Sequence, residues 1–144
     1  RVLRWADPNV PEVAFAGGLP NVYLGVTIEN QEAAKRITWL LATPAAKRFV
    51  SLEPLLGPID TGKPIIYGGM PLGRRFKSPA IDQVIVGGES GPNARPMHPD
   101  WVRSIRDQCK EAGTPFFYKQ TSGSKPEKMP ELDGVQHDEL IWGN

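Results

Sequence analysis

Four short apolar runs constrain the fold of this chain more than any other feature of its sequence. They are rich in β-branched and aromatic residues, which favours strands. Most are apolar throughout rather than alternating, as expected of strands that are covered on both faces. The runs occupy residues 21–28, 48–52, 81–87 and 114–119.

Two segments between these runs have helical periodicity. Asn30 can cap a first helix, whose apolar residues recur at helical spacing over 33–41 before Pro44 stops the pattern. A second helix is predicted from Pro99, which suits a first turn, to Gly113, which suits a C-terminal cap. Helices between strands give βαβ units, so the sequence predicts an α/β fold with a parallel sheet of about four strands and flanking helices. We interpret the large aromatic residues of these segments as packing residues: Trp39, Trp101 and Tyr118.

Three segments fall outside the α/β pattern of residues 21–120. Residues 1–20 are interpreted as a helix end followed by a loop, and because the chain begins mid-pattern without Met we expect it to be the later part of a longer protein. Residues 57–80 have no helical period and are predicted to form a loop or hairpin insertion. Residues 121–144 are polar and weakly patterned, which predicts a C-terminal surface tail.

Composition excludes several classes of function. The 17 basic and 16 acidic residues leave a net charge of +1 without a long run of one sign, so nucleic acid is not indicated as a partner, although a nucleotide-like small ligand stays open. The longest apolar stretches, about 7 residues, are far shorter than the roughly 20 that span a bilayer, and no signal-peptide pattern opens the chain. A single cysteine, Cys109, forms no internal disulfide and assembles no metal site by itself. These features predict a cytoplasmic protein with no membrane contact and no metal or cofactor in this chain.

Acidic residues follow the first three apolar runs, and a basic residue ends the fourth: Glu29, Glu53, Glu89 and Lys119. In parallel α/β proteins ligands bind beyond the carboxyl ends of the strands, so these side chains are expected to form one polar cluster around a pocket. Such crowding shifts pKa values, which suits acid–base catalysis or recognition of a ligand's ammonium or hydroxyl groups. We predict Glu53, Glu89 and Lys119 as catalytic residues. Glu29 or Glu53 could instead accept hydrogen bonds from the first amides of the next helix.

The segment after the third run, GGESGPNARP, is rich in glycine and proline. Glycine lets the backbone approach a ligand closely, although a tight turn alone would also explain these glycines. Arg95 is expected either to pair with a ligand carboxylate or phosphate or to tie the loop to Glu89. His98 is interpreted as a helix cap rather than a general base. The predicted ligand-binding residues are Glu29, Gly87, Gly88, Ser90, Gly91, Asn93 and Arg95.

The segments LPNVYLGVTIENQEAA, SLEPLLGPI, VIVGGESGPNARPMHPDWVR and GTPFFYKQ follow one another in this order. Together they resemble the later half of a phage-associated protein family that is similar to radical S-adenosylmethionine enzymes. The resemblance runs from about Leu19 to Gln120, and LDGVQHDEL shows a weaker similarity. It implies that the sheet is part of an open (β/α) barrel, a partial TIM barrel.

The resemblance also implies cofactors for the parent protein. An upstream half would carry three closely spaced cysteines that hold a [4Fe–4S] cluster, which binds and cleaves S-adenosylmethionine. This chain lacks those cysteines, and Cys109 does not match them. The chain alone is therefore expected to be inactive and to supply one wall of the pocket through Glu29, Glu53, Glu89 and Lys119. Its open sheet edge would pair with the missing N-terminal half or with a second subunit.

Two other functions stay open. A non-catalytic binding or assembly module could keep the scaffold without the cluster, and it would be oligomeric. A cluster-independent enzyme could use the glutamates and Lys119 for acid–base chemistry on a sugar or a nucleotide.

Overall fold

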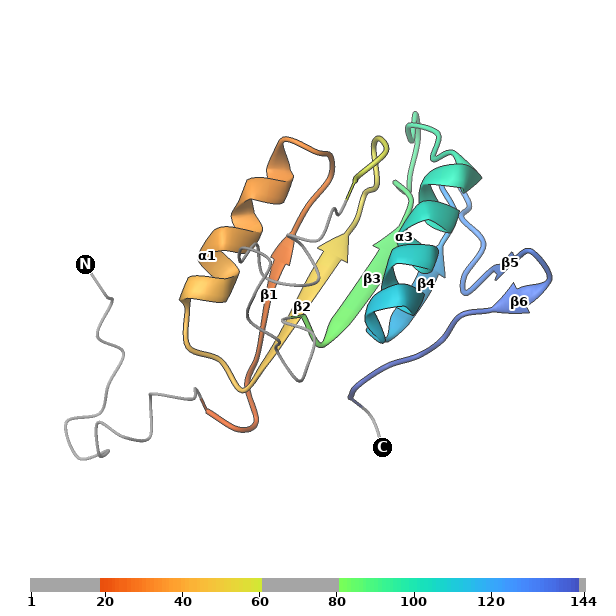
Figure 1. The fold of residues 1–144 in the computed structure, drawn as a ribbon. Coiled ribbons are helices and arrows are strands. Elements are labelled where there is room, and N and C mark those ends of the chain that lie inside the picture. The colour runs from red at the N-terminus through yellow and green to blue at the C-terminus, as the bar shows by residue number, and fades with distance from the viewer. Residues whose placement is uncertain (1–18, 61–80, 143–144) are drawn as a thin grey trace.

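The sheet predicted from the four apolar runs is present in a computed structural model, which describes residues 19–60 and 81–142 (Figure 1). The predicted N-terminal segment 1–20 and insertion 57–80 lie mostly outside these residues. The strands lie in the order β1-β2-β3-β4, and every neighbouring pair is parallel. The predicted α/β class, with a parallel four-stranded sheet and flanking helices, is therefore confirmed. The strands are β1 (Tyr23–Thr27), β2 (Lys47–Leu52), β3 (Gln83–Gly87) and β4 (Phe116–Gln120).

The first helical segment begins with a 3-10 turn and continues as an α-helix, as η2 (Ala33–Lys35) and α1 (Arg36–Ala42). Asn30 caps it as predicted, because its Oδ1 accepts a hydrogen bond from the backbone N–H of Ala33 at 3.0 Å. Ile37 and Leu40 are buried. Trp39 is 74% exposed, so its interpretation as a packing residue is wrong. Residues 37 and 40 take the inward positions of this short helix, which leaves residue 39 facing solvent.

The second helix, α3 (Pro99–Ala112), has the predicted ends. The interpretation of His98 as a cap is confirmed, since its Nδ1 accepts a hydrogen bond from the backbone N–H of Asp100 at 3.2 Å. Gly113 caps the other end with a φ of 69°. The residues that α3 buries are Val102, Ile105 and Cys109. Within the two described ranges, no helix combines the length and the apolar character that a membrane crossing requires.

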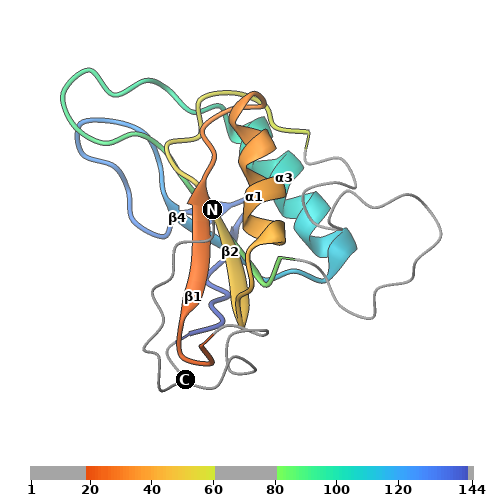
Figure 2. The ribbon, with the colours of Figure 1, turned by 90° about the vertical axis from the view of Figure 1, so that its left-hand side faces the viewer.

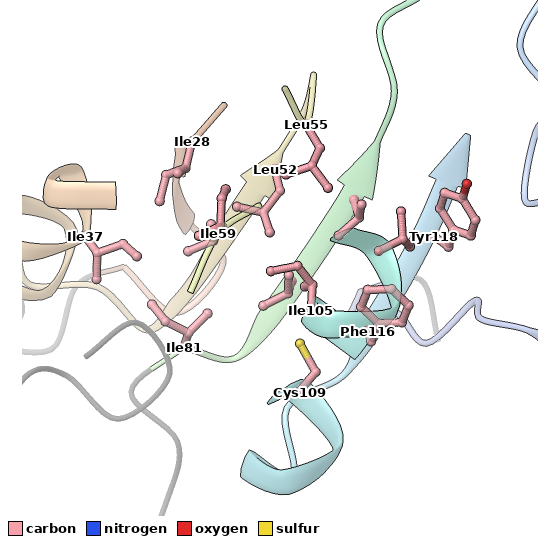
Figure 3. Close-up of a cluster of buried hydrophobic side chains, with 14 of the residues drawn as sticks. Ile28, Ile37, Leu52, Leu55, Ile59, Ile81, Ile105, Cys109, Phe116 and Tyr118 are labelled. Carbon is pink, nitrogen blue, oxygen red and sulfur yellow. The ribbon is translucent and has the colours of Figure 1, made fainter. Parts of the chain in front are cut away.

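Both helices cover the same face of the sheet (Figures 1 and 2). The core lies between them and the strands, where Figure 3 shows Ile37 of α1 and Ile105 of α3 among the side chains around Leu52 of β2. Strand order follows chain order, and right-handed crossovers in such a sheet put every connecting helix on one side. The opposite side, called here the helix-free face, carries Phe49 and Gln83 near the amino ends of the strands.

The two edges of the sheet differ. The outer edge of β4 is covered by the C-terminal segment, which accepts a hydrogen bond from the N–H of Tyr118 at the carbonyl of His137 (2.9 Å) and donates one from the N–H of Met129 to the carbonyl of Lys119 (2.8 Å). The outer edge of β1 has no strand partner within residues 19–60 and 81–142. Of the two edges, β1 is therefore the open one in the described part of the chain.

The C-terminal segment also covers the amino-end half of the helix-free face. The predicted surface tail contains a short hairpin that its sequence pattern did not reveal, formed by β5 (Glu131–Leu132) and β6 (Val135–Gln136). Beyond it, the buried Gln83 donates from Nε2 to the carbonyl of Glu139 (2.8 Å) and accepts from the N–H of Ile141 (3.0 Å). Trp142 then packs edge-to-face on Phe49, with ring centroids 5.5 Å apart.

Candidate functional site

The polar residues predicted at the carboxyl ends of the strands form separate ion pairs. Glu53, directly after β2, lies beside Lys119 of β4, whose Nζ is 2.8 Å from Oε1 and 2.9 Å from Oε2. Where the sequence predicted one cluster of three carboxylates and a lysine, the structure shows three ion pairs, because an arginine in the following helix or loop reaches each of the other two glutamates. The other two pairs are Glu29 with Arg36 at 2.8 Å and Glu89 with Arg95 at 2.6 Å.

The Glu53–Lys119 pair spans the intervening strand β3 at Gly87. A Cβ atom at position 87 would lie 2.8 Å from Oε1 of Glu53 and 3.0 Å from its Cδ, so any side chain there would displace the carboxylate. The Glu53 side chain is 20% exposed and that of Lys119 is 45% exposed. Gly87, predicted to bring backbone near a ligand, makes room in this structure for the carboxylate that holds Lys119.

Gly88 makes a close contact of another kind. A Cβ atom there would lie 2.4 Å from the backbone nitrogen of Ser122, and the N–H of Gly88 donates to the carbonyl of Gln120 at 3.0 Å. The loops that follow β3 and β4 are thereby held together. Figure 2 shows both loops, 88–98 and 121–130, projecting on the side of the sheet away from α1 and α3. They rise beside the carboxyl-end half of the helix-free face, next to the Glu53–Lys119 pair.

Glu89 and Arg95 form a closed unit within their loop. Arg95 donates to Oε2 from Nε (2.6 Å) and from its backbone N–H (2.9 Å), and to Oε1 from Nη2 (2.9 Å). These hydrogen bonds lower the pKa of Glu89 from its usual 4.5 to about 2. The geometry matches the alternative in which Arg95 ties the loop to Glu89. The other predicted loop residues shape its turn, with positive φ at Gly91 (109°) and Asn93 (62°), while Ser90 is exposed.

Two residues at this end of the sheet were not predicted from the sequence as part of the site. Arg36 donates to Oε2 of Glu29 and to the carbonyl of Thr27 (2.6 Å), beside a hollow of about 210 Å³. A basic residue in the first turn of a helix that follows a strand-end glutamate is a signal that could have found it. Gln120 is buried and donates from Nε2 to the carbonyl of Gly88 at 2.8 Å. No feature of the sequence around Gln120 distinguishes it from an exposed glutamine.

A larger groove lies at the opposite end of the sheet. Its volume is about 620 Å³, and it is lined by the last turns of α3, the start of β4 and the β5–β6 hairpin. None of the predicted site residues lines it. Ligands of parallel α/β folds bind at the carboxyl ends of the strands, so the Glu53–Lys119 end is the candidate site.

Within residues 19–60 and 81–142, no group of three or more His, Cys, Asp or Glu side chains could hold a metal ion. Burial raises the pKa of the Cys109 thiol to about 12, with a smaller contribution from the charge of Glu139. A buried protonated thiol is a poor ligand, because metals bind the thiolate. The residues described here therefore do not fit a [4Fe–4S] cluster.

Comparison with known proteins assigns the chain to a family. Residues 2–143 match the model of a family described as protein of unknown function, DUF5131. No curated protein and no solved structure matches the chain.

Proposed function

Because this chain belongs to the DUF5131 family, whose description gives no activity, we propose a function from its fold and its strand-end residues. The chain forms one wall of a (β/α)-barrel pocket in a phage-type radical S-adenosylmethionine-like protein. The observation that carries this proposal is the helix-free face with the Glu53–Lys119 pair at its carboxyl end.

The position of both helices on one face of the sheet supports the proposal that it is one wall of a barrel. Parallel sheets are normally covered on both faces, yet both described helices lie on one face here. In a (β/α) barrel the helices form the outer ring, and the inner end at the strand carboxyl termini surrounds the ligand. The open edge of β1 would then pair with a further parallel strand of the barrel, from an N-terminal half or a second subunit.

The chain's own residues would bind and orient the ligand. A [4Fe–4S] cluster with S-adenosylmethionine supplies one-electron chemistry when bound. Since the described residues do not fit a cluster, its cysteine ligands would come from polypeptide other than these 144 residues. Lys119 and Glu53 would then face the bound ligand from across the pocket.

The iron content of the complete gene product tests the radical part of this proposal. We expect about four irons and a matching amount of sulfide per protein after purification without oxygen, with none in the 144-residue chain as control. A complete gene product free of iron would refute the radical assignment.

Ligand binding tests the wall itself. Equilibrium dialysis of S-adenosylmethionine with the complete gene product is expected to weaken in Lys119→Met and not in Lys47→Met. Lys47 is a matched control because it forms a 2.9 Å pair with Asp82 of similar exposure at the amino ends of the strands. Equal affinity in both variants would contradict the role of the Glu53–Lys119 pair.

An assembly module is the second candidate, favoured by the open edge of β1. Two exposed apolar side chains, Val22 and Tyr23, lie at this edge. Exposed edge strands pair readily with other chains. Light scattering of the 144-residue chain is expected to give a dimer or larger species that becomes monomeric in Val22→Lys, and a monomeric parent chain would exclude self-assembly.

A further inference from the structure

The ion pairs at the carboxyl ends of the strands share an orientation. In each, the carboxylate is the more buried partner and the cation the more exposed: 28% against 48% for Glu29–Arg36, 29% against 60% for Glu89–Arg95, and 20% against 45% for Glu53–Lys119. The Lys47–Asp82 pair at the amino ends has the same order, at 49% and 24%, whereas between α3 and the hairpin Asp133, at 42%, is more exposed than Arg106, at 22%. The candidate site therefore presents the cation of each pair to solvent.

This orientation reverses the ligand expected for the glutamates and agrees with the carboxylate or phosphate considered for Arg95. Three unpaired glutamates would have attracted an ammonium or hydroxyl group, but each glutamate already accepts hydrogen bonds from its own cation. Complementary charge governs which ligands a site favours, and here the outward group is a cation. The ligand group that fits is an oxyanion.

Lys119 has an N–H donor to spare. A lysine ammonium has three N–H donors, and contacts with both oxygens of Glu53 use at most two of them. The lack of a side chain at Gly87 leaves room for the Glu53 carboxylate beside Lys119, and the contacts with both carboxylate oxygens orient the ammonium before a ligand arrives. Arg95 also keeps N–H donors that Glu89 does not use, but it lies in loop 88–98, whereas Lys119 belongs to strand β4 of the sheet itself.

We propose that Lys119 binds an oxyanion of the ligand, a phosphate or carboxylate group, and that Glu53 is the positioning residue that orients it. The ligand would lie against the carboxyl-end half of the helix-free face, beside loops 88–98 and 121–130. This inference rests on the proposed function only in taking that face as a ligand site. It requires neither a cluster nor S-adenosylmethionine.

Lysine-resolved NMR tests the proposal. The complete gene product, labelled with ¹³C at the lysine Cε, is titrated with sodium phosphate and separately with sodium acetate, at constant ionic strength held with sodium chloride. We expect a saturable shift of the Lys119 signal with at least one anion and none of the Lys47 signal. A shift with phosphate alone assigns a phosphate-bearing ligand, and a shift with acetate alone assigns a carboxylate.

Two variants separate binding from positioning. Lys119→Met is expected to weaken binding of the effective anion roughly tenfold or more, read from the protein's amide signals, because a charge-assisted hydrogen bond is lost. Lys119→Arg should retain it and controls for folding. In Glu53→Gln the free Lys119 signal should move and the anion-induced shift should shrink, which a purely structural role of Glu53 would not produce.

Two results would overturn the proposal: no saturable shift with either anion, or equal shifts of Lys119 and Lys47. Neither depends on the iron content. An iron-free protein that still shows the Lys119 shift would remove the radical assignment and leave the oxyanion site in place.

Discussion

Alanine at Gly87 and at Gly88 should have very unequal effects on stability, although the two residues are adjacent. Neither has a positive φ, so the alanine backbone is tolerated at both positions. What differs is the atom that the new Cβ would meet. At position 87 it is Oε1 of Glu53, the end of a flexible side chain, and at position 88 it is the backbone nitrogen of Ser122.

The magnitudes follow from these contacts. In Gly87→Ala the Glu53 carboxylate can rotate away, which loses a partly exposed ion pair worth about 0.5–1 kcal/mol and is offset by about 0.4–1 kcal/mol of reduced chain entropy in the unfolded state. The unfolding free energy should change by less than about 0.5 kcal/mol. In Gly88→Ala the backbone of the loop after β4 must move, and overpacking of about 3 kcal/mol plus a hydrogen bond of about 1 kcal/mol, less the entropy gain of about 1 kcal/mol, leaves a loss of about 3 kcal/mol.

Urea unfolding followed by far-UV circular dichroism measures both changes. With a slope of roughly 2 kcal/mol per molar urea, Gly88→Ala should lower the midpoint by about 1.5 M, and Gly87→Ala should leave it nearly unchanged. Equal losses in the two variants would refute the reasoning, because they would mean that the Glu53 side chain is as immovable as backbone.

Three further predictions concern other parts of the molecule. Gln83→Leu should reduce the unfolding free energy by about 2–3 kcal/mol, because it leaves buried backbone groups of the C-terminal segment unpaired, and Trp142 fluorescence should shift to longer wavelength as its ring contacts loosen. Cys109 should not react with a thiol reagent at pH 8 until urea unfolds the protein, since its thiol is buried and has a pKa of about 12; rapid labelling of the native chain would contradict this burial. Hydrogen bonds from arginines lower the pKa of both Glu89 and Asp133 to about 2, so their contribution to stability is complete above the usual values of 4.5 and 3.8 and is lost as the pH falls toward 2; the urea midpoint should fall over this range less steeply in a Glu89→Gln, Asp133→Asn double variant than in the parent.

Much of the secondary structure could be predicted because its signals are local. The Asn30 cap acts on a residue three positions away, and the His98 cap on one two positions away. Strand composition and helical periodicity are properties of single segments, and together they were enough to predict a parallel sheet. Trp39 marks the limit of this reasoning, since its exposure depends on which helix positions the sheet covers.

For the candidate site, the sequence predicted where the charged residues lie but not which residues they pair with. That three glutamates and a lysine lie at the carboxyl ends of the strands follows from the chain, because each ends an apolar run or follows it within two residues. Their partners could not be predicted in this way. Arg36 forms an ion pair with Glu29, and Arg95 forms one with Glu89. Both pairs depend on how the first turn of a helix and the loop after β3 are placed beside the ends of the strands.

By itself, the sequence determined the four strands of the sheet, its two helical segments, their order and the end of the sheet at which charged residues gather. Only the tertiary structure decided which charges meet and which face solvent. Glu53 and Lys119 are 66 residues apart, and Gln83 and Ile141 are 58 apart, so their contacts depend on strand register and on the path of the C-terminal segment. Short-range preferences set a helix or a strand, whereas a pair that crosses β3 over Gly87 exists only after three strands have assembled.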